Sequence, residues 1–87
     1  MTHVEALAGE LDIAVVDELI ARVDQLHQDG VRDVTFDMAG VTFCNGRGFA
    51  VLVHAYRLGM HVTVRRMRPH IRRHLTVMGL ESFATVD

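Results

Sequence analysis

The sequence contains no lysine, one cysteine and one proline among 87 residues. The single cysteine, Cys44, cannot form an internal disulfide, which is typical of proteins from reducing compartments. The longest unbroken apolar run, residues 49–53, has five residues, whereas a membrane-spanning helix needs about 20. No basic and then apolar leader opens the sequence. We therefore expect a cytoplasmic protein without direct membrane insertion.

The charges are unevenly distributed, and every basic residue is an arginine. Residues 1–37 hold nine acidic residues and two arginines, and residues 38–87 hold two acidic residues and seven arginines, so the net charges are −7 and +5. The absence of lysine has two explanations that the sequence leaves open. One is genomic base composition, and the other is a surface that makes bidentate contacts through arginine.

The first half of the chain predicts a strand, a helix and a second strand. Residues 3–8 alternate loosely and end at a glycine. Asp12 is a suitable N-cap for a helix whose apolar residues recur at helical spacing up to Gly30. Residues 31–38 are rich in Val, Thr and Phe and predict a strand. The Ala39-Gly40 pair predicts a turn after this strand.

The second half predicts helix, strand and helix again. The helix after the Asn-Gly-Arg-Gly motif ends at Gly59, and residues 60–65 alternate as a strand does. Pro69 suits the first turn of a third helix, which we expect to end at Gly79. Residues 83–86 fit either a last strand or a short turn. This alternation of strands and helices indicates an α/β fold with a parallel or mixed sheet.

Four short patterns follow one another along nearly the whole chain. They are Gly9-Glu10-Leu11-Asp12, Val34-Thr35-Phe36-Asp37, Gly40-Val41-Thr42-Phe43, and Leu75-Thr76-Val77-Met78-Gly79-Leu80 followed by Phe83. With these patterns the sequence resembles STAS domains, the fold of bacterial anti-sigma factor antagonists. The resemblance implies a single domain over residues 1–87, with a mixed, mostly parallel sheet of about four strands and three to four helices.

The resemblance also implies one more strand before the first strand predicted here. Only eight residues precede Gly9, which leaves little room for that strand. Either the sheet lacks the family's usual first strand, or the assigned start of the sequence is wrong.

The family's functional motif reads apolar-Asp-Ser-Ser/Thr-Gly-Leu, and its first serine accepts phosphate from a partner kinase. The resemblance places this motif on Cys44, Asn45, Gly46, Arg47, Gly48 and Phe49. The motif's Gly is kept at Gly48, and Gly46 stands at the acceptor position. Because glycine has no hydroxyl group, phosphorylation there is chemically excluded, and the phosphorylation motif is degenerate.

The same six residues, Cys44 to Phe49, are our candidate partner-binding site. One explanation of the motif is structural, because Asn and Gly tolerate left-handed backbone and Asn is a good N-cap. The other is docking, since amides at a helix N-terminus attract anions and Arg47 adds a charge with five donors. The residues leave both explanations open.

Other candidate sites have simpler explanations. Cys44 is explained as a small hydrophobic residue. A catalytic thiol would need a base, and no recognised motif links Cys44 to one. His70 and His74 share a helix face, but no acidic residue lies between Asp37 and Glu81 to complete a metal site. The arginine run in residues 65–73 lacks interleaved aromatic residues for stacking on nucleic acid. We therefore expect no metal, no cofactor and no nucleic-acid partner.

The sequence thus predicts a non-enzymatic protein-interaction module. The resemblance implies an anti-sigma factor or a related histidine-kinase-like ATPase as the partner, bound without the usual serine phosphorylation switch. Three alternatives stay open at this point: a STAS-like subunit of a lipid-transport ATPase complex, a part of a larger signalling assembly, and a sensor of anionic small molecules. A homodimer is also compatible with the sequence.

Overall fold

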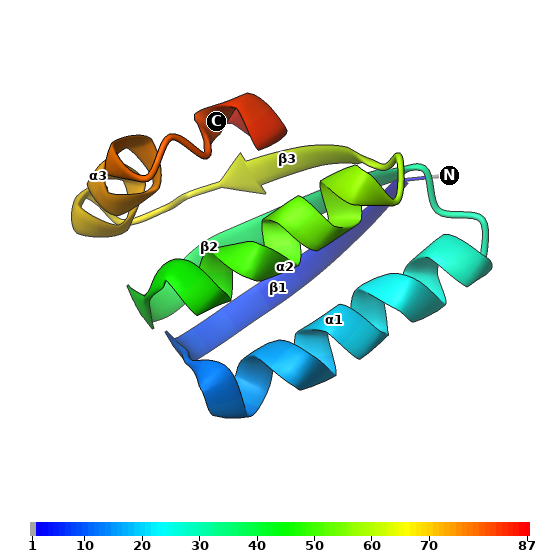
Figure 1. The fold of residues 1–87 in the computed structure, drawn as a ribbon, viewed down its shortest axis with the longest axis horizontal. Helices are drawn as coiled ribbons and strands as arrows, with labels where there is room; N and C mark the ends of the chain where they lie inside the picture. The colour runs from blue at the N-terminus through cyan, green and yellow to red at the C-terminus, as the bar shows by residue number, and fades with distance from the viewer. Residues whose placement is uncertain (1) are drawn as a thin grey trace.

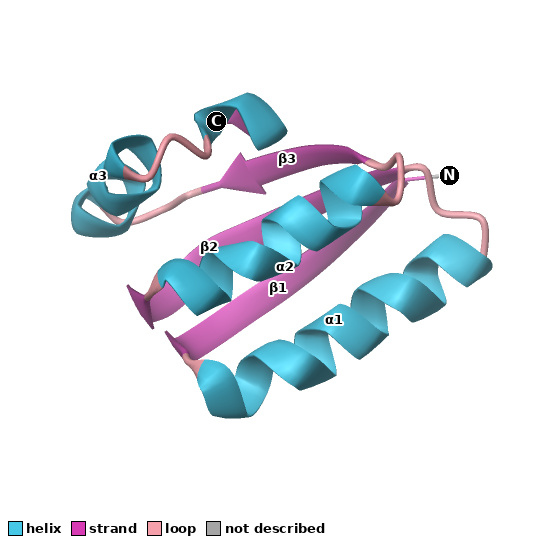
Figure 2. Cartoon of the chain, viewed as in Figure 1, coloured by secondary structure: helices cyan, strands magenta, loops and turns pink. Residues whose placement is uncertain are grey.

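A computed structural model describes residues 2–87 of the chain. The elements follow in the order β1 (Thr2–Leu11), α1 (Ile13–Gln28), β2 (Asp33–Cys44), α2 (Gly46–Arg57), β3 (His61–Arg65), α3 (Pro69–Val77), the 3-10 helix η1 (Glu81–Phe83) and β4 (Thr85–Val86). Figure 1 shows the course of the chain, and Figure 2 shows how helices alternate with strands.

The four strands form one sheet in the order β1-β2-β3-β4, and each pair of neighbours is parallel. The expected mostly parallel α/β sheet is confirmed. No antiparallel pair occurs among the described residues, so the sheet is parallel rather than mixed. Helices α1 and α2 lie together on one face of the sheet (Figure 1), and α1 packs against α2. β1 begins at Thr2, the first residue that the structure describes.

The core lies between this helix pair and the sheet. Val34, Phe36 and Met38 alternate along β2 and are at most 1% exposed, while the residues between them are half-buried. Phe49 and Ala55 bring α2 onto the same core. Alternate residues of β2 are buried, and the buried residues of α2 lie along one side of the helix. Both patterns match the apolar periodicities of the sequence.

The predicted turn at Ala39-Gly40 is wrong, because β2 continues through both residues to Cys44. Here β1 approaches β2 closely: a Cβ at Gly40 would lie 3.2 Å from the Leu7 carbonyl oxygen and 3.2 Å from the Ala8 Cβ. The pairing register shifts between Ala6 and Ala8, as at a β-bulge. Glycine inside a strand thus marks a close backbone approach and an irregular register, not the strand's end.

The C-terminal part follows the predicted signals. Pro69 is the first residue of α3. After α3, Gly79 has φ +70°, its N–H donates to the Thr76 carbonyl, and the Leu80 N–H donates to the Leu75 carbonyl. This is the Schellman arrangement, which requires a left-handed residue that glycine supplies. For residues 83–86 the sequence predicted either a strand or a short turn, and the structure has both. Phe83 ends the 3-10 helix η1, and Thr85–Val86 form the short strand β4.

Candidate functional site

The candidate site is the junction between β2 and α2, at the carboxyl end of the longest strand. Asn45 is the N-cap of α2, and the Gly48 N–H donates to Asn45 Oδ1 at 3.0 Å. The predicted N-cap is therefore confirmed. Left-handed backbone is not used here, because Asn45 has φ −99° and neither Gly46 nor Gly48 has a positive φ.

Gly48 is required for space rather than for backbone freedom. A Cβ at this position would lie 2.6 Å from Cys44 Sγ and 2.8 Å from the Leu11 carbonyl oxygen. Real Cβ atoms do not approach backbone oxygen so closely, because repulsion rises steeply inside van der Waals contact. The absence of a side chain lets α2 begin directly against the end of β1.

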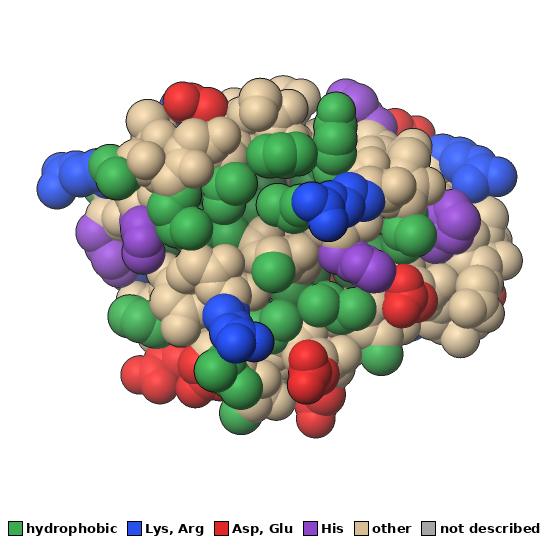
Figure 3. Space-filling view, viewed as in Figure 1, with side chains coloured by type: hydrophobic (Ala, Val, Ile, Leu, Met, Phe, Trp, Pro, Cys, Tyr) green, Lys and Arg blue, Asp and Glu red, His purple; other side chains and the backbone are tan. Residues whose placement is uncertain are grey.

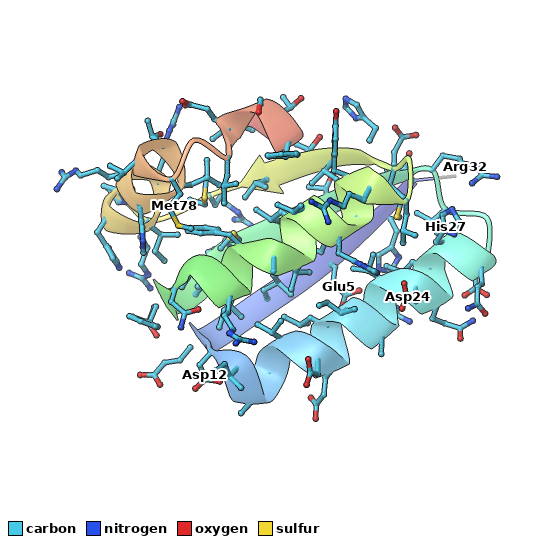
Figure 4. The ribbon with its side chains drawn as sticks, viewed as in Figure 1. Glu5, Asp12, Asp24, His27, Arg32 and Met78 are labelled. Carbon is cyan, nitrogen blue, oxygen red and sulfur yellow. The ribbon has the colours of Figure 1, made fainter. Side chains whose placement is uncertain are left out.

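Gly46 is the first residue of α2, and its neighbour is Met78. A Cβ at Gly46 would lie 3.0 Å from the Met78 Cε and 3.7 Å from the Met78 Sδ. Met78 follows the end of α3 and reaches toward the first turn of α2 (Figure 4). A flexible thioether thus lies against Gly46, the residue that the family resemblance aligns with the acceptor serine.

The six candidate residues differ in accessibility. Cys44 and Phe49 belong to the core, and Gly48 is buried as well. Asn45 and Gly46 are half-buried, and the side chain of Arg47 is exposed. A partner at this junction would therefore touch Asn45, Gly46 and Arg47, while the three buried residues hold the turn in place. Their role in partner binding stays a prediction.

Cys44 has the environment of a core residue. The residue is 4% exposed, and its Sγ lies 3.6 Å from the Asn45 carbonyl oxygen, within reach of a weak S–H hydrogen bond. Burial raises the pKa of the Cys44 thiol to about 12, because desolvation disfavours the thiolate. The thiol is therefore protonated at neutral pH and is a poor nucleophile.

A groove runs along the outer side of α2 and begins at this junction. Its volume is about 380 Å³. It is lined by Gly46, Ala50, Val53, His54 and Arg57 of α2, by Ile20 of α1, and by Met78 and Leu80 after α3. Figure 3 shows apolar side chains gathered over α2 on this face of the molecule. Most of the residues that line the groove are therefore apolar, and Arg57 is the arginine among them.

Two polar features border the groove. On the α1 side, His54 Nε2 lies 2.6 Å from Asp24 Oδ1 and joins the two helices, and Asp24 is labelled on α1 in Figure 4. At the far end, Arg57 has no hydrogen-bond or ion-pair partner among the side chains described, and the same is true of Arg47 beside Gly46. The charges of both arginines are therefore available to a partner.

The groove could only partly be anticipated from the sequence. Gly46, Ala50, Val53 and Arg57 are spaced at i, i+4, i+7 and i+11, which places them on one side of α2. From this spacing the sequence alone could have shown that these four residues share one side of α2. Ile20, Met78 and Leu80 come from distant parts of the sequence, and no local pattern connects them with α2.

The remaining candidates take part in separate contacts. His74 packs edge-on against Phe49 with ring centroids 5.7 Å apart, and His70 Nε2 lies 3.2 Å from the Thr42 carbonyl oxygen. Within residues 2–87, no three His, Cys, Asp or Glu side chains are grouped as a metal site would need. None of the helices in this range has the length and apolarity that crossing a bilayer requires.

Part of the arginine run makes structural contacts. Arg66 pairs with Asp37 through two hydrogen bonds, and Arg68 Nε donates to the Val41 carbonyl at 2.9 Å. Arg65 Nε lies 3.7 Å from the Asp87 carboxylate. These contacts join β2, the β3–α3 connection and the C-terminal segment. The rest of the run, Arg72 and Arg73 on α3, is exposed.

Comparison with solved structures finds the same fold in several bacterial proteins. An anti-sigma factor antagonist from Mycobacterium paratuberculosis is 23% identical, with a TM-score of 0.78 over 95% of this chain and 74% of that chain. The phosphorylated Bacillus cell fate determinant SpoIIAA is 19% identical, with a TM-score of 0.73 over 97% of this chain and 80% of that chain. A sulfate transporter family protein from Wolinella succinogenes is 14% identical, with a TM-score of 0.77 over 93% of this chain and 69% of that chain.

Comparison with curated protein sequences finds no match for the chain. The family model described as "Mlab, STAS domain" matches residues 3–86, a range that runs from the second residue of β1 to the end of β4 and includes the whole β2–α2 junction. The chain therefore belongs to the Mlab-type STAS domain family.

Proposed function

We propose that this protein is a non-enzymatic STAS module of the cytoplasm that binds an anti-sigma-factor-type kinase without a serine phosphorylation switch. One observation carries the proposal: the first residue of α2, which the family resemblance aligns with the acceptor serine, is Gly46, and the exposed Arg47 follows it. Similarity in fold to anti-sigma factor antagonists supports the choice of partner.

The physical argument rests on charge. A phosphoserine adds roughly 1.5–2 negative charges at neutral pH and repels a partner that fits the neutral surface. Gly46 cannot carry that charge. The Asn45 cap and the close packing at Gly48 nevertheless keep the turn in the geometry that places residue 46 at the helix start. The module therefore binds constitutively, or it competes with a relative that does respond to phosphorylation.

The test measures binding to a panel of purified anti-sigma-type kinases in the presence of ATP. We expect one kinase to bind the protein and to leave its mass unchanged. Arg47→Glu should weaken that complex at least tenfold, because it reverses the exposed charge beside Gly46. The control Arg32→Glu changes an exposed arginine just before β2, at the other end of that strand, and should leave the affinity within twofold.

A second variant tests the missing switch directly. Gly46→Ser restores a hydroxyl, and the Met78 side chain beside it is flexible enough to move aside. We expect the bound kinase to phosphorylate this variant and the complex to dissociate. Failure of all kinases to bind the unmodified protein would refute the proposal. Stable binding of phosphorylated Gly46→Ser would refute the argument from charge.

A second candidate keeps the fold and changes the partner to the ATPase of a lipid-transport complex, where STAS-like subunits also occur. Two observations favour it: the matching family model is described as Mlab, and one similar fold comes from a sulfate transporter family protein. Co-purification of the protein with a transport ATPase, and not with any anti-sigma-type kinase, would select this candidate.

A further inference from the structure

We infer that the groove along α2 binds an amphipathic helix of the partner protein, whose apolar side chains lie on Ala50 and Val53 and whose acidic residues meet Arg47 and Arg57. The inference rests on the proposed function, because it names the part of the partner that this module recognises. Its evidence is the shape, composition and charge of the groove.

The dimensions of the groove fit a helix. Its floor follows one side of α2 from Gly46 to Arg57, a rise of about 16 Å at 1.5 Å per residue. A partner helix that lies along it has side chains at i, i+4, i+7 and i+11 on its inner side, which is the pattern of helices bound in apolar grooves. The small, exposed residue Ala50 allows the partner backbone to approach closely, while Met78 lies over Gly46 at the N-terminal end.

The walls of the groove provide apolar contact on both sides. Ile20 borders it from α1, and Met78 and Leu80 border it from the turn after α3. Met78 is 41% exposed and is not held in the core. Because methionine is flexible and polarizable, it adapts to the side chain placed against it. The outer side of the groove is open (Figure 3), which favours a rod-shaped partner over an enclosed small molecule.

The charges determine which helix fits. The twelve residues of α2 contain no acidic side chain, and neither do the nine residues of α3. On α1, Asp24 is paired with His54 of α2. Arg47 and Arg57 stand at opposite ends of α2, ten residues apart and without a described partner. A helix with acidic residues near both ends complements this arrangement, and a basic helix is repelled by it.

A peptide experiment tests the groove independently of any kinase. The probe is an 18-residue helical peptide with leucines at i, i+4, i+7 and i+11 and glutamates near both ends. Its control carries lysines in place of those glutamates. We expect the acidic peptide to bind the full 87-residue chain at least ten times more tightly than the basic one, with NMR shift changes centred on α2 and Met78.

Variants of exposed residues locate the contact without disturbing the core. Ala50→Glu places a charge in the groove floor and should weaken binding of the acidic peptide at least tenfold. The matched control Ala21→Glu adds the same charge at an exposed position of α1 outside the groove and should change binding less than twofold. Arg57→Glu leaves one positive and one negative end, so it should reduce the tenfold preference for the acidic peptide to less than twofold.

The outcomes separate this inference from the proposed function. If a kinase binds the protein and Ala50→Glu leaves that affinity unchanged, the groove inference is overturned and the proposed function stands. If no kinase binds but the acidic peptide occupies the groove, the proposed function fails and the helix site stands. Tight binding of laurate in the groove, with no binding of either peptide, would overturn the inference in favour of a small-molecule site.

Discussion

At the scale of single residues, the two glycines of the β2–α2 junction have different roles. Gly48 leaves room for the end of β1, since a Cβ there would meet Cys44 Sγ and the Leu11 carbonyl oxygen at less than 3 Å. Gly46 meets only the end of a flexible methionine. Gly48 is thus required by packing, whereas no contact in the structure requires a glycine at position 46.

This contrast predicts different stabilities for two alanine variants. Gly48→Ala should lower the free energy of unfolding by about 1–3 kcal/mol, because a crowded core position cannot relax around backbone oxygen. Gly46→Ala should change it by less than about 1 kcal/mol, since higher helix propensity offsets a small shift of Met78. Urea denaturation of both variants measures the difference. Equal stability of the two variants would contradict the packing argument.

Cys44 is the second residue with a testable property. Its buried thiol has a pKa raised to about 12, so very little thiolate exists at pH 8. We expect iodoacetamide at pH 8 to react with the native protein at least about tenfold more slowly than with the urea-unfolded chain. Mass spectrometry follows the alkylation. Equal rates in the two states would show that the thiol is accessible in the native protein.

At the scale of elements, one ion pair holds the connection between β3 and α3 against β2. Arg66 has φ +58°, an uncommon left-handed conformation for a residue other than glycine. Its guanidinium makes two hydrogen bonds to the Asp37 carboxylate on β2, and the Ala39 N–H donates to Asp37 Oδ1 at 3.1 Å. The pair holds the chain where it leaves the sheet toward α3 and the groove wall.

The pair predicts a dependence of stability on pH. The hydrogen bonds from Arg66, followed by that from the Ala39 N–H, lower the pKa of Asp37 in the folded protein. Its stabilising contribution is therefore complete above the ordinary aspartate pKa of about 3.9, and it is lost as the pH falls through the lowered folded-state pKa. Asp37→Asn should be less stable than the unmodified protein at pH 7, and the difference should vanish in strong acid.

Urea denaturation between pH 7 and pH 2 measures this difference. The control is Asp17→Asn, at an exposed position of α1. That variant should follow the unmodified protein across the range. A difference for Asp37→Asn that grows as the pH falls would contradict the assigned sign.

At the scale of the whole molecule, the uneven charge along the sequence becomes a surface property. The acidic N-terminal part supplies α1, and the basic C-terminal part supplies α2 and α3. Because parallel strands lie in chain order, α1 and α2 become neighbours on one face of the sheet. The groove along α2 is therefore bordered by the acidic α1 on one side and by the segment that follows the basic α3 on the other.

The sequence by itself determined most elements of the fold. Apolar spacing located the three helices, Asp12 and Asn45 marked helix starts, and Gly30 and Gly79 marked helix ends. Each signal depends only on residues within a few positions, because caps and amphipathic faces are local. The prediction that residue 46 cannot accept phosphate also needs the sequence alone, because it depends only on the identity of that residue.

Only the tertiary structure decided how those elements meet. The sequence predicted Gly40 in a turn, but the structure has it inside β2, where β1 approaches closely. Gly48 lies against Leu11, which is 37 positions away in the sequence. The tertiary structure also brought Ile20, Met78 and Leu80 around one side of α2. These contacts depend on strand order and on the packing of segments far apart in sequence, and no local pattern encodes which distant side chain fills a given space.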